Sequence, residues 1–320
     1  MLTTRQVILI KKETTTGTDA QPKPDADALL VNSLTFSNAN ARMIDRPAIR
    51  PNLDPLQQVY GGTLAQVQFT AEIKGSGDPT KPPEIAPALE ACGFKADATK
   101  TTLFELADDG LSSVTIYVYQ DGRVKKITGA RGTVSFTLNA GELAMCDFTL
   151  TGHFVEDVDA PLVAPIYKTT VPVALIGLSD IKLENKAVNV GSISIDVGNN
   201  VVTPADITKP DGYAEVRIAN RDVTGSIDPE MKLLANGSNF RDIWTSGANL
   251  SLTTGAVGKT GGNKFTITLP KISLREAAPG ERESIITEAI SFGATPLLAG
   301  ESVDGQKAAK AAKTMSILFE

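Results

Sequence analysis

The chain has 320 residues, of which 42% are hydrophobic and 21% charged, and this length favours about two globular domains. Its net charge of −6 argues against tight binding of nucleic acid, because surfaces that hold nucleic acid are usually basic. Cys92 and Cys146 are too few for a disulfide framework, and we expect neither a signal peptide nor a membrane helix, so a reducing, cytosolic folding compartment fits best.

The chain begins with a short strand and a polar segment. Residues 6–10 (QVILI) are prone to form a strand. Residues 13–24 are polar and contain prolines, so they predict a loop or arm with no means of burying itself.

Residues 31–154 form a first β-rich unit, which opens with a strand at 31–36. Residues 67–73 then alternate strictly between apolar and polar side chains, which is typical of a strand with one buried face. Residues 83–93 have proline at the start, an acid in the first turn and glycine after the end, which are the signals of a short helix. Downstream lie a hairpin turn at 120–122 and predicted strands at 134–138 and 145–154.

Residues 190–292 repeat this order in a second unit. The opening strand at 190–195 (VGSISI) matches 31–36 (VNSLTF), and residues 223–227 keep the phase of 67–73. The matching helix and strands are predicted at 238–247, with Ser238 as N-cap, and at 265–269 and 284–292. Five matches in one order indicate a duplication.

The repeat predicts two domains, residues 1–163 and 164–320, joined by a proline-containing linker at 155–176. In this division the first domain carries the N-terminal arm. The second domain is expected to end in a short helix at 306–313 and a terminal strand at 315–320.

The sequence offers no set of residues that points to catalysis or metal binding. The only histidine, His153, lacks a nucleophile motif beside it, so we expect an exposed or interface histidine. One histidine and two cysteines argue against a structural zinc site. Residues 255–260 (GAVGKT) fail the spacing of a phosphate-binding loop and precede a strand, which predicts a turn. We therefore expect no enzyme, no metal and no cofactor.

Apolar residues of the two predicted helices could either anchor a partner or fill the core. Short helices that cover a sheet usually bury such side chains, so core positions are predicted. The residues concerned are Ala86, Ala88, Leu89, Ala91 and Trp244.

Four segments resemble the major tail tube proteins of long-tailed, non-contractile bacteriophages. They are 49–62 (IRPNLDPLQQVYGG), 71–77 (AEIKGSG), 83–94 (PEIAPALEACGF) and 221–229 (RDVTGSIDP). The resemblance spans most of the chain and implies a mainly β fold with short flanking helices, in two tandem β-sandwich or partial-barrel tube domains. These are assembly motifs, which are less specific than a catalytic signature.

The resemblance also implies a structural virion protein that self-assembles into stacked rings and forms a hollow tail tube. Such a tube is built in the host bacterial cytoplasm around a tape measure protein, meets tail terminator and tail tip proteins, and later conducts double-stranded DNA without binding it specifically. Family members with a single unit resemble one half of this chain. The duplication therefore predicts a homotrimeric ring with pseudo-sixfold symmetry.

Two sets of residues are expected at the surfaces of this assembly. The long loop at 37–62 and its counterpart near 198–213 are expected to contact an adjacent ring, with a plain solvent loop as the alternative. The expected inter-ring residues are Arg46, Arg50, Asp54 and Tyr60. Because acidic side chains repel DNA and uncharged hydroxyl side chains do not hold its phosphates, the polar strand faces are expected to line the channel. Those residues are Gln68, Thr70, Glu72, Asp147, Thr149, Thr151, Thr224, Ser226 and Asp228.

Two other classes of protein stay open at this point. A non-viral, two-domain β-sandwich binding or adhesion protein predicts secretion, exposed aromatic platforms and often disulfides, none of which the sequence offers. An enzyme with dispersed acidic residues needs paired carboxylates in one pocket, which a single sequence does not exclude.

Overall fold

The computed structural model describes residues 2, 4–178, 180–234 and 239–320. These residues are mainly in strands, with two short helices, as predicted. The elements of the first half are β1 (Gln6–Lys12), β2 (Ala28–Leu29), β3 (Ser33–Ala39), β4 (Met43–Ile44), β5 (Val59–Tyr60), β6 (Leu64–Glu72), α1 (Ala86–Ala91), β7 (Phe94–Ala96), β8 (Leu103–Leu106), β9 (Val114–Gln120), β10 (Arg123–Asn139) and β11 (Met145–Asp159). Those of the second half are β12 (Lys182–Leu183), β13 (Lys186–Ala187), β14 (Val190–Asp196), β15 (Asn199–Val202), β16 (Arg217–Arg221), β17 (Thr224–Pro229), α2 (Phe240–Ser246), β18 (Asn249–Thr253), β19 (Phe265–Arg282), β20 (Ile285–Ala294), β21 (Ser302–Val303), β22 (Gln306–Lys307) and β23 (Ser316–Phe319).

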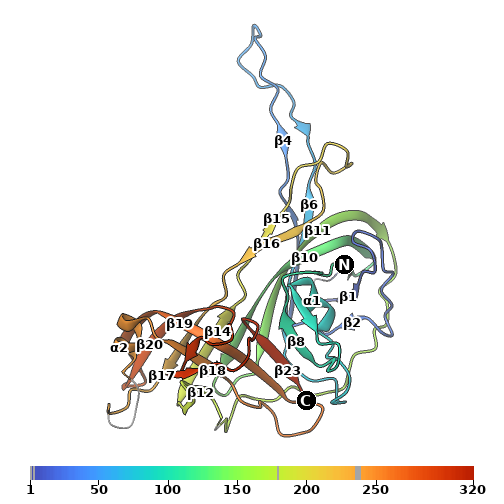
Figure 1. The fold of residues 1–320 in the computed structure, drawn as a ribbon. Helices are drawn as coiled ribbons and strands as arrows, with labels where there is room; N and C mark the ends of the chain where they lie inside the picture. The colour runs from blue at the N-terminus through green and yellow to red at the C-terminus, as the bar shows by residue number, and fades with distance from the viewer. Residues whose placement is uncertain (1, 3, 179, 235–238) are drawn as a thin grey trace.

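One antiparallel sheet runs through both halves of the chain (Figure 1). Its strand order is β3–β6–β11–β10–β14–β17–β20–β19. The first four strands belong to the first unit and the last four to the second. In each unit the order is the same: the opening strand (β3 or β14), the strand after the long loop (β6 or β17), the closing strand (β11 or β20) and the strand that precedes the closing strand in sequence (β10 or β19). The pairing thus agrees with the predicted duplication.

One predicted match between the units is wrong. Residues 134–138 lie in the half of β10 that pairs with β11 and β14, whereas 265–269 lie in the half of β19 that pairs with β18 and β23. By position in the sheet, the counterpart of 134–138 is the C-terminal half of β19, which pairs with β20. Alternation reveals a strand with one buried face but carries no information about its neighbours.

The two long strands also enter a second layer. The N-terminal half of β10 pairs with β9, which continues to β1 and β2. The last strand of the chain, β23, joins β19 to β8 of the first half. Strand pairs therefore cross residue 163 at two places, β10–β14 and β23–β8. A division into domains at that residue stays a prediction.

A continuous apolar core lies behind the eight-stranded sheet and includes residues of both halves. Phe69 and Phe148 stack within it, with ring centroids 5.0 Å apart. Gly225 faces Phe292 so closely that a β-carbon would lie 2.4 Å from the ring, so this strand position requires glycine. The core is built of aliphatic side chains together with nine of the eleven phenylalanines.

The helices differ in how deeply they are buried. The predicted apolar residues of α1 are buried, and its chain leaves through Gly93 at φ +89°. In α2, Asn239 caps the N-terminus and Gly247 ends the helix in the left-handed region, as the glycine predicts. The predicted cap Ser238 lies outside the described residues. The prediction that Trp244 is in the core is wrong, because α2 packs mainly on β19 and leaves this side chain 40% exposed.

The predicted helix at 306–313 is also wrong. Residues 302–307 form the small hairpin of β21 and β22, and the backbone of Ala312 pairs with Leu297. A helix of eight residues is only marginally stable without tertiary packing. These residues instead form backbone hydrogen bonds with the preceding segment. The terminal strand at 315–320 is confirmed as β23, and the hairpin turn at 120–122 is confirmed between β9 and β10.

We predict that Phe148→Ala lowers the free energy of unfolding by about 3–5 kcal/mol, because it leaves a cavity opposite Phe69. Urea denaturation of the soluble subunit measures the change. Thr149→Ala, on the opposite face of the same strand, is the control and should change stability by about 0.5 kcal/mol or less. Equal losses in the two variants would contradict the assignment of the buried face.

Candidate assembly surfaces

The face of the eight-stranded sheet that points away from the core is a polar surface, and it extends across the boundary between the two units. Pairing aligns one row across all eight strands, and apart from buried Gly293 its members are exposed or half-buried. In strand order the row is Ser33, Thr70, Asp147, Ser135, Asp196, Thr224, Gly293 and Ser273. We call this surface the polar face. All the predicted channel residues lie on it, although Thr151 is buried.

Hydroxyl and carboxylate groups on the polar face bond to one another across strands. Thr70 Oγ1 donates to Asp147 Oδ1 at 2.5 Å, and the hydroxyls of Ser194 and Ser226 lie 2.8 Å apart. Asp228 accepts from the backbone of Gly191 and forms a 2.6 Å ion pair with Arg282. Its charge is therefore largely compensated.

The sheet ends in two edges that have no strand partner among the described residues. At one end β3 pairs with β6 alone. At the other end the C-terminal half of β19 pairs with β20 alone. Between the units, the corresponding edges do meet: residues 135–139 of β10 pair with residues 192–196 of β14. An exposed strand edge is a template for pairing with another chain.

A long arm projects from the polar sheet between β3 and β6 (Figure 1). Its stem is the two-residue ladder of β4 and β5, and the tip beyond it carries Ile49 and Leu53 with fully exposed side chains. The predicted inter-ring residues Arg46, Arg50, Asp54 and Tyr60 all lie on this arm and are exposed or half-buried. Exposed apolar side chains on an extended loop indicate a contact surface.

The base of the arm is fixed by the matching loop of the second unit, the β15–β16 hairpin. Tyr213 donates its hydroxyl to the carbonyl of Asn40, and the guanidinium of Arg42 lies 4.0 Å from the Tyr213 ring centre. His153 Nδ1 contacts the carboxylate of Asp211 on the same hairpin. The histidine predicted to be exposed or at an interface is thus half-buried in a contact between the two units.

Arg131 secures this hairpin to the sheet. Its buried guanidinium donates to Glu215 Oε1 and the Val216 carbonyl, each at 2.6 Å, and to the carbonyls of Leu111 and Ser112. Burial raises the pKa of Glu215, but the hydrogen bond and charge of Arg131 outweigh it and hold that pKa below its ordinary value. This contact could not be predicted from local pattern, because Arg131 and Glu215 are 84 positions apart.

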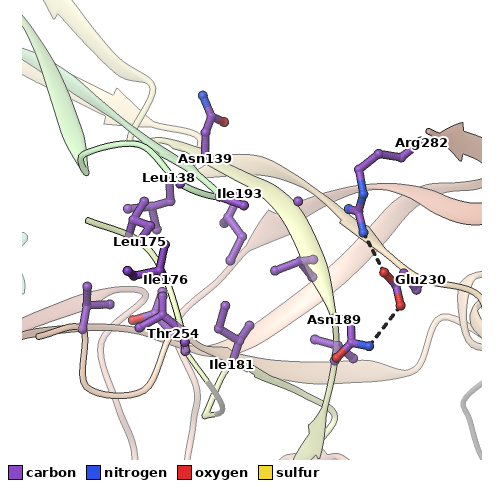
Figure 2. A pocket seen from close by; sticks show the side chains of 18 residues that line it. Leu138, Asn139, Leu175, Ile176, Ile181, Asn189, Ile193, Glu230, Thr254 and Arg282 are labelled. Atoms are coloured by element: carbon purple, nitrogen blue, oxygen red, sulfur yellow. Dashed lines mark hydrogen bonds and ion pairs between the residues drawn. The ribbon is translucent and has the colours of Figure 1, made fainter. Parts of the chain in front are cut away.

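A cavity of about 380 Å³ lies beside the β10–β14 junction (Figure 2). Apolar side chains from β10, the linker and β14 form most of its wall, including Leu138, Leu175 and Ile193. Its polar rim is internally paired, since Glu230 bonds to Arg282 at 3.1 Å and to Asn189 at 3.0 Å. The cavity is a packing gap behind the junction and brings no catalytic groups together.

Other predicted features are ordinary. Residues 255–260 form a turn that closes through the Val257–Phe265 bridge. Cys92 and Cys146 are buried free thiols. Among the described residues, no three His, Cys, Asp or Glu side chains are placed to hold a metal ion. No helix in the described part of the chain has the length and apolar character needed to cross a membrane.

Comparison with protein families matches residues 3–295 to the phage tail tube protein model. The chain belongs to the phage tail tube protein family. This membership makes it a structural component of the virion tail and implies a non-enzymatic protein that assembles with itself and with other tail components. No curated protein matches the chain. The family match replaces the alternative of a non-viral adhesion protein.

We predict that Arg131→Met destabilises this tail tube protein by about 2–3 kcal/mol, because the buried carbonyls that Arg131 binds lose their donor. Urea unfolding at neutral pH measures the loss. The difference in stability between the variant and the wild type should become smaller as the pH falls through the lowered pKa of Glu215. Protonation of Glu215 then weakens its pair with Arg131 in the wild type as well.

The matched control is Arg123→Met on the same strand. Arg123 is half exposed and pairs with Asp157, and such a pair contributes only about 0–1 kcal/mol. If both variants lose the same stability, the buried contacts of Arg131 are not what holds the hairpin.

Proposed function

We propose that three copies of the chain close into a ring and that rings stack into the tail tube. The observation that carries the proposal is the β10–β14 junction, in which the last strand of one four-stranded segment pairs with the first strand of the next. The edge of β19 corresponds to that of β10, and the edge of β3 corresponds to that of β14. Both are unpaired among the described residues, at the two ends of the eight-stranded sheet. Pairing β19 of one copy with β3 of the next repeats the internal junction and closes the ring head to tail.

The duplication supports three chains in each ring. Each chain supplies two segments that occupy successive places in one sheet, so three chains supply six. The ring then has pseudo-sixfold symmetry with alternating covalent and non-covalent junctions.

The polar face is the proposed lining of the channel. Its hydroxyl and amide groups carry no charge that would hold passing DNA. Its acids repel the phosphates, which carry about one negative charge per 1.7 Å of duplex. Two arginines of the second unit are held in ion pairs: Arg275 pairs with Asp222, and Arg282 pairs with Asp228 and Glu230. The proposed lining residues are Gln68, Thr70, Glu72, Asp147, Thr149, Thr224, Ser226 and Asp228.

The arm is the proposed contact between rings, through Arg46, Arg50, Asp54 and Tyr60 at its polar positions and Ile49 and Leu53 at its tip. Assembly takes place in the host cytoplasm around a tape measure protein. The finished tube meets the tail terminator and tail tip proteins at its ends.

We predict threefold symmetry in tubes of the purified protein. A cryo-electron microscopy map should contain three full-length chains in each ring and place the polar face along the bore. The reason is that two wall segments are already joined within each chain. Six full-length chains in a ring would overturn the trimer, and a bore lined mainly by Lys and Arg would overturn the channel assignment.

We predict that shortening the arm stops elongation and leaves the subunit folded. Residues 45–58 are replaced by an Asn-Gly turn, which joins β4 to β5 and keeps the Asn40 and Arg42 contacts at the base. Circular dichroism and urea unfolding test the fold, and negative-stain microscopy tests the tubes.

A milder variant keeps the length of the arm. Ile49→Ser combined with Leu53→Ser should slow elongation by removing only the exposed apolar pair. Ile166→Ser, at an exposed position on the linker, is the control. Normal tubes from the shortened, soluble protein would show that the arm is not the inter-ring contact.

A further inference from the structure

An apolar groove of about 680 Å³ lies between α2 and β19, at the free end of the eight-stranded sheet. Leu233 and Leu234 border it with 78% and 71% of their surface exposed. Its other apolar lining residues are Ala187, Val188, Met231, Phe240, Trp244, Ala277, Ala278 and Pro279, and its charged lining residues are Lys186, Glu230, Lys232, Arg241, Glu276 and Glu288. A contiguous apolar surface of this kind marks an interaction site on a soluble chain.

In the first unit, the corresponding strand edge and helix end are covered. There, strand β14 of the second unit runs along β10, and Ile193 and Ile195 are buried in the core behind the sheet. Beyond β14, the amide of Asn199 donates to the carbonyl of Cys92 at the end of α1, at 2.6 Å, and to that of Gly132, at 2.9 Å. The following unit therefore covers both the strand edge and the end of the helix.

The surroundings of the glycines that follow the two helices differ in the same way. A β-carbon on Gly93, after α1, would have Ile218, Arg221 and Asn199 of the second unit within 4 Å. A β-carbon on Gly247, after α2, would have no described atom within 4 Å. Among the described residues of one chain, nothing covers the end of α2 as the second unit covers the end of α1.

We propose that residues 33–42 of a second copy cover the β19 side of this groove and the end of α2, in the way that residues 192–201 cover the edge of β10 and the end of α1. Asn40 follows Ser33 by seven residues, as Asn199 follows Ser192. Leu34 and Phe36 take the places of Ile193 and Ile195, and both are only half-buried in the single chain. This inference rests on the proposed ring, which brings β3 of one copy to β19 of the next.

Trp244 lines the groove and is the only tryptophan in the chain, so its fluorescence reports on the groove alone. We expect its emission to shift to shorter wavelength and its quenching by acrylamide to fall several-fold when subunits assemble. Unchanged quenching in samples that contain tubes would overturn the groove contact and leave the ring proposal standing. Absence of tubes under all assembly conditions would count against the proposed function itself.

Cross-linking then identifies the occupant. Ser246, just inside the Gly247 cap, corresponds to Cys92, just inside Gly93, so Ser246→Cys is combined with Asn40→Cys. The native cysteines are buried and should not react with a short bismaleimide. Assembled samples should give cross-linked dimers and trimers and no larger species. The control combines Ser246→Cys with Ile166→Cys, on the exposed linker, and should give monomers.

The size of the products separates the outcomes. A ladder without an upper limit would overturn the inference, because the contact would then join stacked rings. A ladder that ends at six chains would support the groove contact and overturn the trimer. Monomers alone from samples that contain tubes would overturn the groove contact.

Discussion

The antiparallel pairing of β10 with β14 is the interaction on which the architecture depends. Along residues 135–139 it joins two four-stranded segments into one sheet, aligns the polar rows of both and brings Ile193 and Ile195 into a shared core. A slip of one residue would turn these isoleucines toward the polar face and Ser194, which lies between them, toward the core. Register at this junction therefore sets both the hydrophobic packing and the chemistry of the exposed surface.

Strands and helix ends could be predicted from sequence wherever local pattern determined them. The alternation at 67–73 correctly separated Phe69 from Thr70, and Gly247 correctly marked the end of α2. Local pattern failed where long-range neighbours decided the outcome. Residues 265–269 alternate like 134–138 but pair with β23, and the Lys- and Ala-rich run at 306–313 gives way to strand and loop contacts.

The candidate assembly surfaces could be predicted only in part, for the same reason. Period-two alternation revealed the polar face, and the length of the loop at 37–62 revealed the arm. The contacts that fix the base of the arm and its neighbouring hairpin could not be predicted, because Arg131, His153 and Tyr213 bind partners 58 to 173 positions away in the sequence. The exposure of Trp244 was also hidden, because amphipathic pattern does not tell whether the apolar side of a helix is covered by its own chain or by another.

The two units carry loops of very different reach: the first extends as the arm, and the second folds back as the β15–β16 hairpin against its base. In a ring of three such chains, long projections would alternate with short ones around the circumference. Successive rings would then fit together only in orientations a third of a turn apart, whereas six identical segments would allow twice as many. Divergence of the two loops after duplication would thus restrict the angular freedom between rings, and torsional stiffness of the tail would follow from the unequal lengths of two hairpins.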